Sequence, residues 1–333
     1  MLTVSADADE AVIRRLVEEV IPALRERLTV ELGLPIPTVR VRAGGPGVRS
    51  VSLILDEVPT GGLTLPSAWV LACDPEEADL MGMAGTRVQM GGQAMLAVDE
   101  ETATQARDAG LPVLDLAGAA GRLLEAEIRA HAGRLLSLQV TQALLDTLER
   151  RAPAVVREVS KRVSVPVLCE ALRQLLDEGV PLRNLERILE GVASLPEGTG
   201  EGPGAVERTV SRARRAVGRQ LVAAHGRGGA LTVYLLDPLV EDLLRSARVE
   251  TEEGPVIALE PQRQGELLEA LSKLPTGAVL LVAAPLRRYL WRVGEHTGRR
   301  LTVLAFEELP PDAAIQPVDA VRIPGLDPLA IAA

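Results

Sequence analysis

The stretch from residue 110 to 192 constrains the fold most, because its apolar residues repeat with the period of an α-helix. Successive apolar positions lie three, four or seven residues apart on one helix face. They are Leu124, Ile128, Leu135, Leu138, Leu145 and Leu148. A tight helical pair follows: Pro166 opens its first helix, Gly179 ends it and Pro181 opens the second. The centre of the chain is therefore predicted to be helical.

Three strings in the chain are more specific than this period. The first has His131, Leu135 and Gln139, followed by Leu144-Leu-Asp146. The second is Val180-Pro-Leu-Arg-Asn-Leu-Glu-Arg-Ile-Leu-Glu190, and the third is Gly33-Leu-Pro-Ile-Pro-Thr-Val-Arg-Val-Arg42. In these strings, the chain resembles the cytoplasmic domain of the FHIPEP family, the export-gate proteins of flagellar and injectisome type III secretion. Ser137 stands where that family usually has glycine.

The patterns along the chain, taken with this resemblance, predict an α+β fold of several subdomains. Residues 1–57 with 111–131 are expected to form a discontinuous α/β subdomain, 58–110 a small inserted subdomain, 132–204 a helical subdomain, and 205–333 a C-terminal α/β subdomain. Val113-Leu-Asp115 is expected to be a buried strand that returns to the first sheet.

Local signals set the expected elements in more detail. Residues 8–32 predict an amphipathic helix that Pro22 kinks or splits. Gly44–Gly47 predict a turn between two strands, and residues 194–204 a linker. In the C-terminal part, strands are expected at 231–236, 256–259, 278–284 and 301–305, with helices between them. The tail after Pro310 is rich in Pro and Ala and is expected to be poorly ordered at its end.

Composition argues against nucleic acid as a partner. The net charge is −10, and aromatic residues are only 2% of the chain, so both phosphate attraction and base stacking are poorly supported. The alternative function is a helix-turn-helix regulator, with Arg183 and Arg187 on the second helix of the pair at 166–192. The helix at 205–224 exposes Arg208, Arg212, Arg215 and Arg219, either to solvent or to an anionic partner.

No catalytic, cofactor or metal site is predicted. His131, His225 and His296 are not spaced as metal ligands, and Cys73 and Cys169 are expected to be free thiols. Acidic pairs such as Glu307-Glu308 are expected to be solvated, in loops or on exposed faces. A third hypothesis, an enzyme that binds a ligand at the strand ends of the C-terminal part, has no phosphate loop on the correct side of a strand.

The resemblance implies a binding platform and not an enzyme. Family members form a nonameric ring at the cytoplasmic face of the inner membrane, where they receive chaperone–substrate complexes and contact the stalk of the export ATPase. They also carry a membrane-embedded half, so this chain is expected to be an excised domain or a stand-alone homologue. Its longest apolar run, 278–286, is far shorter than the roughly 20 residues of a membrane span.

The flagellar branch of the family docks chaperones with an Asp-Pro-Ala-Phe-Gly string and a downstream threonine. An ungapped alignment places residues 88–92 at that string and Gly118 at the threonine. The candidate partner-binding residues are thus Val88, Met90, Gly91 and Gly118. The family's Asp, Phe and Thr are absent here, which favours an injectisome-type or divergent member.

Overall fold

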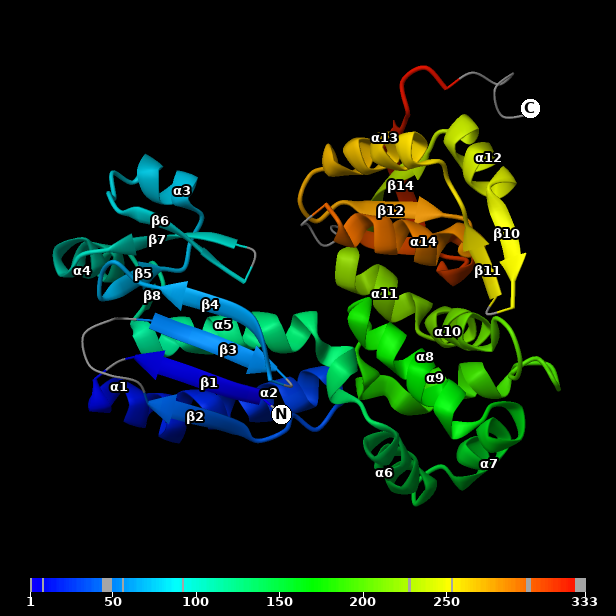
Figure 1. The fold of residues 1–333 in the computed structure, drawn as a ribbon, viewed down its shortest axis with the longest axis horizontal. Coiled ribbons are helices and arrows are strands. Elements are labelled where there is room, and N and C mark those ends of the chain that lie inside the picture. The colour runs from blue at the N-terminus through cyan, green and yellow to red at the C-terminus, as the bar shows by residue number, and fades with distance from the viewer. Residues whose placement is uncertain are drawn as a thin grey trace. The chain divides into compact units, whose positions relative to one another are not determined.

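The structure, a computed structural model, describes residues 2–7, 9–43, 50–55, 57–91, 93–226, 229–252, 254–297 and 301–326. The chain divides into two compact units, Met1–Leu135 and Leu136–Ala333. Each unit has its own sheets (Figure 1). The α+β class predicted from the sequence is confirmed. The predicted turn at Gly44–Gly47 lies outside the described residues.

The first unit begins with a mixed four-stranded sheet in the order β2-β1-β3-β4. Its strands are β1 (Leu2–Asp7), β2 (Val39–Ala43), β3 (Ser50–Leu55) and β4 (Val58–Thr64). β1 pairs parallel with β2 and antiparallel with β3. The helix α5 (Leu116–Ala130) contacts β4 and also the helix that joins β1 to β2.

That connecting helix runs without a break from α1 (Glu10–Arg15) through the π-helical turn η1 (Leu16–Val20) to α2 (Ile21–Leu32). Pro22 has no N–H to donate to the preceding turn. The helix therefore widens into a π turn just before the proline, where a kink or split was predicted. Leu16, Leu24 and Leu28 are buried, as their spacing predicts.

The second sheet of this unit has the order β6-β7-β5-β8 and carries two short helices. Its elements are β5 (Trp69–Leu71), α3 (Pro75–Leu80), β6 (Thr86–Met90), β7 (Gln93–Val98), α4 (Glu100–Asp108) and β8 (Val113–Leu114). β8 pairs with β5, so the predicted return of this segment to the first sheet is wrong. A strand of two residues carries no sequence signal for its neighbour.

Strand pairing also bears on where the insertion begins. β4 pairs with β3, so the first sheet continues to Thr64, past the predicted boundary at residue 58. The inserted sheet accordingly runs from Trp69 to Leu114. The division of the whole chain into four subdomains stays a proposal.

The second unit starts with a helical layer. Its elements are α6 (Leu138–Glu149), α7 (Pro153–Arg162), α8 (Val165–Asp177), the 3-10 turn η3 (Leu182–Asn184), α9 (Leu185–Ala193), α10 (Ala205–Ala216) and α11 (Gly218–His225). α9 packs against both α7 and α10. Ser137 caps α6, because its Oγ accepts from the Val140 N–H at 3.2 Å.

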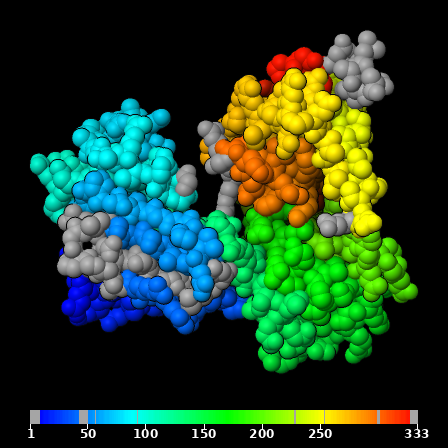
Figure 2. All heavy atoms as spheres, viewed as in Figure 1, coloured from blue at the N-terminus to red at the C-terminus, as the bar shows by residue number. Residues whose placement is uncertain are grey.

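A four-stranded parallel sheet with the order β13-β12-β9-β14 follows. Its elements are β9 (Ala230–Leu236), α12 (Pro238–Ser246), the hairpin β10 (Arg248–Thr251) and β11 (Gly254–Ile257), α13 (Pro261–Ser272), β12 (Val279–Val282), α14 (Ala284–Glu295), β13 (Thr302–Ala305), the 3-10 turn η4 (Phe306–Glu308) and β14 (Ala314–Val321). All four residues of β12 are buried, which places this strand in the core. In Figure 2 the helical layer (green) directly abuts this α/β part (yellow to orange).

β14 has no counterpart among the strands predicted from the sequence. It pairs in parallel with β9 and contains a bulge between Pro317 and Asp319. Because Pro317 cannot donate a ladder hydrogen bond, it is compatible only with an edge strand or a bulge. The end of the tail, for which poor order was predicted, lies outside the described residues.

The segment expected to be a linker is held by one arginine. Arg208 donates to the carbonyl oxygens of Thr199, Pro203 and Glu201, at 2.7, 3.0 and 3.1 Å. Further along the same helical region, Arg215 donates to the Glu307 carbonyl and Arg219 pairs with Asp312. Of the four arginines predicted to be exposed on the helix at 205–224, three therefore bind to other groups of the chain.

Candidate functional site

The predicted partner-binding residues lie in the first unit but do not form one cluster. Val88 and Met90 are in β6, and Gly91 follows with φ of +56°. A Cβ on Gly91 would lie 2.3 Å from the Cβ of Ala126 in α5. Gly118 lies eight residues earlier in that helix, about 12 Å along its axis. Met90 is 3% exposed and packs inward, so Val88 and Gly118 are the better positions for testing this site.

Gly118 has a structural partner. Asp115 caps α5: its Oδ1 accepts from the Gly118 N–H at 2.8 Å. The other carboxylate oxygen, Oδ2, pairs with Arg15 in α1. This cap fixes the start of the helix on which the predicted site depends.

Replacing Asp115 with alanine is expected to lower the free energy of unfolding of the first unit by about 1 kcal/mol, the usual cost of losing an N-cap. Asp115→Asn keeps an acceptor for the amide and should cost less. Urea unfolding can be followed by the fluorescence of Trp69 in a Trp291→Phe background, because the chain has two tryptophans, one in each unit. Equal losses for the two variants would contradict the role of the cap.

The second unit contains a buried cluster of four ionised side chains. It joins α8 and α10 of the helical layer to α14 and η4 of the α/β part. Its members are Glu178, Arg214, Arg287 and Glu308, whose side chains are 1–4% exposed. We call this set the buried ion cluster. The sequence predicted that Glu308 is solvated, in a loop or on an exposed face; Glu308 is buried, and that prediction is wrong.

Arg214 is at the centre of the buried ion cluster. Its Nε and Nη2 donate to the two carboxylate oxygens of Glu308 at 2.7 and 3.0 Å, and its Nη1 donates to Glu178 Oε2 at 3.0 Å. Nη2 also donates to the Val303 carbonyl of β13 at 3.2 Å. Burial opposes the charged guanidinium, but Glu308 and Glu178 outweigh it and raise the pKa of Arg214 above its usual value. Arg287 completes the cluster by pairing with both carboxylates.

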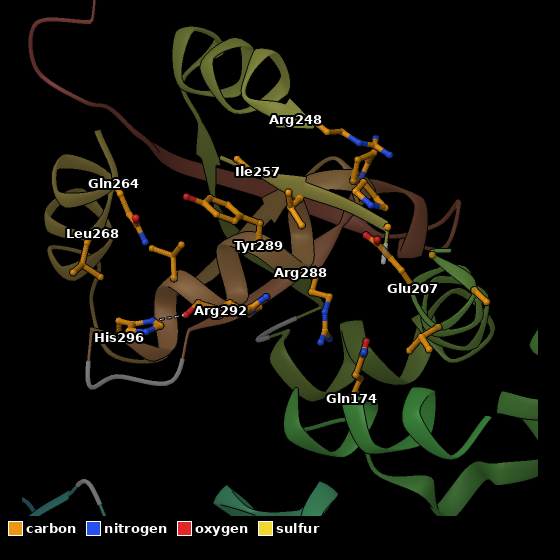
Figure 3. A pocket seen from close by; sticks show the side chains of 18 of the residues that line it. Gln174, Glu207, Arg248, Ile257, Gln264, Leu268, Arg288, Tyr289, Arg292 and His296 are labelled. Carbon is orange, nitrogen blue, oxygen red and sulfur yellow. Dashed lines mark hydrogen bonds between the residues drawn. The ribbon is translucent and has the colours of Figure 1, made fainter. Parts of the chain in front are cut away.

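Beside the cluster lies a cavity of about 720 Å³, within the range of ligand-binding pockets. Its walls come from α8, α10, the β10–β11 hairpin, α13 and α14 (Figure 3). The polar and charged side chains that line it include Gln174, Glu207, Arg248, Arg288, Arg292 and His296. Apolar side chains complete the lining, among them Ile257, Leu268 and Val293.

Glu207 is half-buried in this wall. Burial raises its pKa above the usual value, against the attraction of Arg287, Arg288 and Arg248, and Glu178 adds repulsion. A carboxyl group with a raised pKa favours the folded state at low pH, and this stability is lost as the pH rises through the folded pKa.

Glu207→Gln is therefore expected to raise the free energy of unfolding at pH 7, because the charged form no longer has to be buried. The gain should shrink as the pH falls below the ordinary pKa of glutamate, about 4.3, where wild-type Glu207 is protonated in both states. Urea titrations at pH 7 and pH 4 test this. A variant that is less stable than wild type at pH 7 would show that the arginines prevail over burial.

The helical pair at 166–192 does not present a free recognition helix. α9 packs on α7 and α10, and Ile188 and Leu189 are fully buried. Arg187 donates to the Ala216 carbonyl and to Glu190. A helix that reads a DNA groove needs an exposed face with free basic side chains. The arrangement of this pair gives the regulator hypothesis no support.

Three further observations concern the thiols, metal ligation and membranes. Cys73 and Cys169 are free thiols, as predicted, and burial raises the pKa of Cys73. In the described part of the chain, no group of three or more His, Cys, Asp or Glu side chains is placed to hold a metal ion. Of the helices in the described ranges, none combines the length and apolar character that crossing a bilayer requires.

The fold matches that of C-terminal domains from type III secretion proteins. The Chlamydia pneumoniae CdsV protein superposes with a TM-score of 0.83 at 21% identity, covering 97% of this chain and 98% of that one. The nonameric SctV-C from EPEC gives 0.80 at 19% identity, covering 96% and 98%. The chain belongs to the FHIPEP family, whose model matches residues 3–314. The resemblance identified from the three sequence strings is thus confirmed, and the family is that of the export-gate proteins of type III secretion.

Curated relatives agree with this assignment. The probable translocation protein y4yR of Sinorhizobium fredii is 31% identical over 208 residues, which cover 60% of this chain and 29% of that protein. The flagellar biosynthesis protein FlhA of Bacillus subtilis is 29% identical over 312 residues, which cover 90% and 45%. The chain spans less than half the length of these relatives.

Proposed function

We propose that this chain is the cytosolic platform of a type III secretion export gate, on which chaperone–substrate complexes and the stalk of the export ATPase dock during protein export. The observation that carries the proposal is the family match, which extends over residues 3–314. Membership of this family supports a role in protein export. The identity of the docking partners is a more specific part of the proposal.

Three solved structures support the proposed partner docking and ring assembly. CdsV of Chlamydia pneumoniae has been solved in a complex with CdsO, and it covers 96% of this chain with a TM-score of 0.83. SctV-C from EPEC and the EscV cytosolic domain of a type III secretion system were both solved as nonamers. We therefore propose a nonameric ring for this chain, at the cytoplasmic face of the inner membrane. In a ring, each subunit presents two different surfaces to its two neighbours. The rotation from one subunit to the next closes the ring.

A docking platform works through shaped, rigid surfaces. The buried ion cluster provides such rigidity, because it fixes α8 and α10 against α14 and η4 with charge-assisted hydrogen bonds. Val88 and Gly118 remain the proposed chaperone-docking positions of the first unit.

Deleting the gene in its native host tests the proposal. We expect type III substrates to disappear from the culture supernatant and to return on complementation. Isothermal titration of the full-length protein with the host's own stalk protein and chaperones tests the docking partners. Gly118→Glu should weaken chaperone binding and leave stalk binding unchanged, with Ala109→Glu as the exposed control. Unchanged secretion in the deletion strain would overturn the proposal.

A further inference from the structure

Three nitrogen-bearing side chains line one side of the cavity along a single helix. Arg288, Arg292 and His296 lie four residues apart in and just after α14, and all three border the cavity (Figure 3). Four residues are about one helical turn, so successive members are about 6 Å apart and the set spans about 12 Å. We call this set the α14 ladder. Its shape is linear, whereas a compact anion would need donors that converge on one point.

The positive charge of the ladder is poorly neutralised. Within the described residues, the Arg292 guanidinium has neither an ion pair nor a hydrogen bond. Arg288 has a carboxylate oxygen, Glu178 Oε1, at 3.7 Å, but that carboxylate already serves Arg214 and Arg287. Burial and the neighbouring Arg287 and Arg292 hold the pKa of Arg288 below its usual value, although Glu178 and Glu207 oppose them. In a chain of net charge −10, this local excess of positive charge calls for an anionic ligand.

Gln174 gives a second, independent indication of a ligand. Its side chain is 9% exposed and borders the cavity, on the side of Arg288 in Figure 3. Its Oε1 is buried without a hydrogen-bond partner among the described residues. A buried amide oxygen without a donor destabilises the protein, so a ligand that brings an N–H relieves this cost. A peptide group supplies an N–H, whereas a simple carboxylate ion has no donor and inorganic phosphate offers only an O–H.

Much of the remaining lining is apolar, although Glu207, Arg248 and Gln264 also border the cavity. Ile257 on the hairpin and Leu268 on α13 border the cavity together with Val293 on α14. A ligand that fills the cavity must therefore bury apolar groups and also offer carboxylates to the α14 ladder.

We propose that this cavity binds an acidic, amphipathic peptide segment of a partner protein. Its carboxylates lie against Arg288 and Arg292, its apolar side chains against Ile257 and Leu268, and a backbone N–H of its first turn, which has no partner within the helix, donates to Gln174. The inference rests on the cavity alone, so it stands or falls separately from the proposed role in export.

Fluorescence anisotropy with synthetic probes tests the proposal on the full-length protein. The probe is a fluorescein-labelled helical peptide of about 15 residues, with glutamates four residues apart and leucines on the adjacent strip. We expect saturable binding that weakens with added salt, as for exposed charge pairs. The same peptide with glutamine in place of glutamate should bind at least about tenfold more weakly, because it loses the charge-assisted bonds.

Variants then locate the binding. Arg292→Glu should weaken the acidic peptide about tenfold or more, because it turns attraction into repulsion. Arg183→Glu makes the same charge change at an exposed arginine outside the cavity and should leave affinity unchanged. Glu207→Gln removes a carboxylate from the wall and should strengthen binding. Gln174→Leu should weaken both peptides, because the amide contact is independent of glutamate.

Three results would overturn the proposal: equal affinity for the acidic and glutamine peptides, equal losses in Arg292→Glu and Arg183→Glu, or no measurable binding of any peptide. Citrate and inorganic phosphate are titrated in parallel. If either binds at the cavity while the peptides do not, the site takes small anions and the peptide proposal is wrong. Circular dichroism of each variant confirms that it is folded.

Discussion

Replacing Glu178 with alanine is expected to lower the free energy of unfolding of the second unit by about 3–5 kcal/mol. The Glu178 side chain is 1% exposed and pairs with both Arg214 and Arg287. Its removal leaves two buried guanidinium groups with Glu308 as their remaining carboxylate partner. Such a loss is typical when one member of a buried ion pair is deleted, because the charge that stays behind is not solvated.

The measurement uses Trp291, which lies in α14 four residues after Arg287. In a Trp69→Phe background, its fluorescence reports unfolding of the second unit alone. Glu186→Ala is the matched control, since Glu186 also pairs with an arginine, Arg151, at 2.7 Å, but on the surface. Its cost should not exceed about 1 kcal/mol. If the two variants lose the same amount, the buried ion cluster does not stabilise this unit as argued.

A double variant separates the cost of breaking a buried ion pair from the net contribution of the buried ion cluster to the free energy of unfolding. Arg214→Met combined with Glu308→Leu removes one buried positive and one buried negative charge together. Exchanging a buried ion pair for apolar side chains of similar volume is often neutral or stabilising. We expect the double variant to be more stable than Arg214→Met alone and more stable than Glu308→Leu alone.

Sequence reasoning succeeded where an element carries its own pattern. β12 is an uninterrupted apolar run, β9 is apolar except for Thr232, and α8 has leucines on one face and Gly179 after its end, so each was predicted close to its observed bounds. β14 was missed for the opposite reason. Seven of its eight residues are exposed or half-buried and one of them is proline, so no apolar alternation marks it as a strand. Its position depends on β9, which supplies the backbone partner.

The buried ion cluster was also missed, because its members are scattered over more than a hundred residues of sequence and charged residues are expected on the surface. A local signal did exist. Arg214 lies between Val210 and Val217 at helical spacing, on the buried face of α10. An arginine in an apolar stripe predicts a buried carboxylate partner. Nothing local, however, indicates that this partner is Glu308.

The cavity, too, could be predicted only in part from the sequence. The spacing of Arg288, Arg292 and His296 is visible in the sequence as one helix face. That this face borders a cavity, which Gln174 of α8 also lines, follows only from the tertiary fold. The periodicity of a helix determines which side chains share a face, and tertiary packing determines what that face contacts.

Gly218→Ala is expected to destabilise the second unit by about 2–3 kcal/mol, the upper range for overpacking a tight site. A Cβ on Gly218, the first residue of α11, would lie 1.9 Å from the carbonyl oxygen of Glu308. No side chain can turn aside to relieve this contact, because the obstacle is backbone. The turn η4 would have to move, and the Glu308 carboxylate would be drawn away from Arg214.

A comparison of two glycines isolates this effect. Gly265 lies within α13, and a Cβ there would meet no atom within 4 Å. Gly265→Ala should therefore stabilise the unit by about 0.5–1 kcal/mol, the usual gain when alanine replaces glycine inside a helix. Both variants are measured by Trp291 fluorescence, so the same chemical change is expected to have opposite signs at the two positions.

Coupling between Gly218 and Glu308 gives the sharpest form of this prediction. If Gly218→Ala acts by displacing Glu308, then much of its cost should vanish once the Glu308 carboxylate has been removed. The double variant Gly218→Ala with Glu308→Ala should lose less than the sum of the single losses, by more than the roughly 0.5 kcal/mol within which independent sites add. Strict additivity would mean that the added methyl strains α11 alone. In that case, the approach of η4 to α11 would not be what holds the buried ion cluster in place.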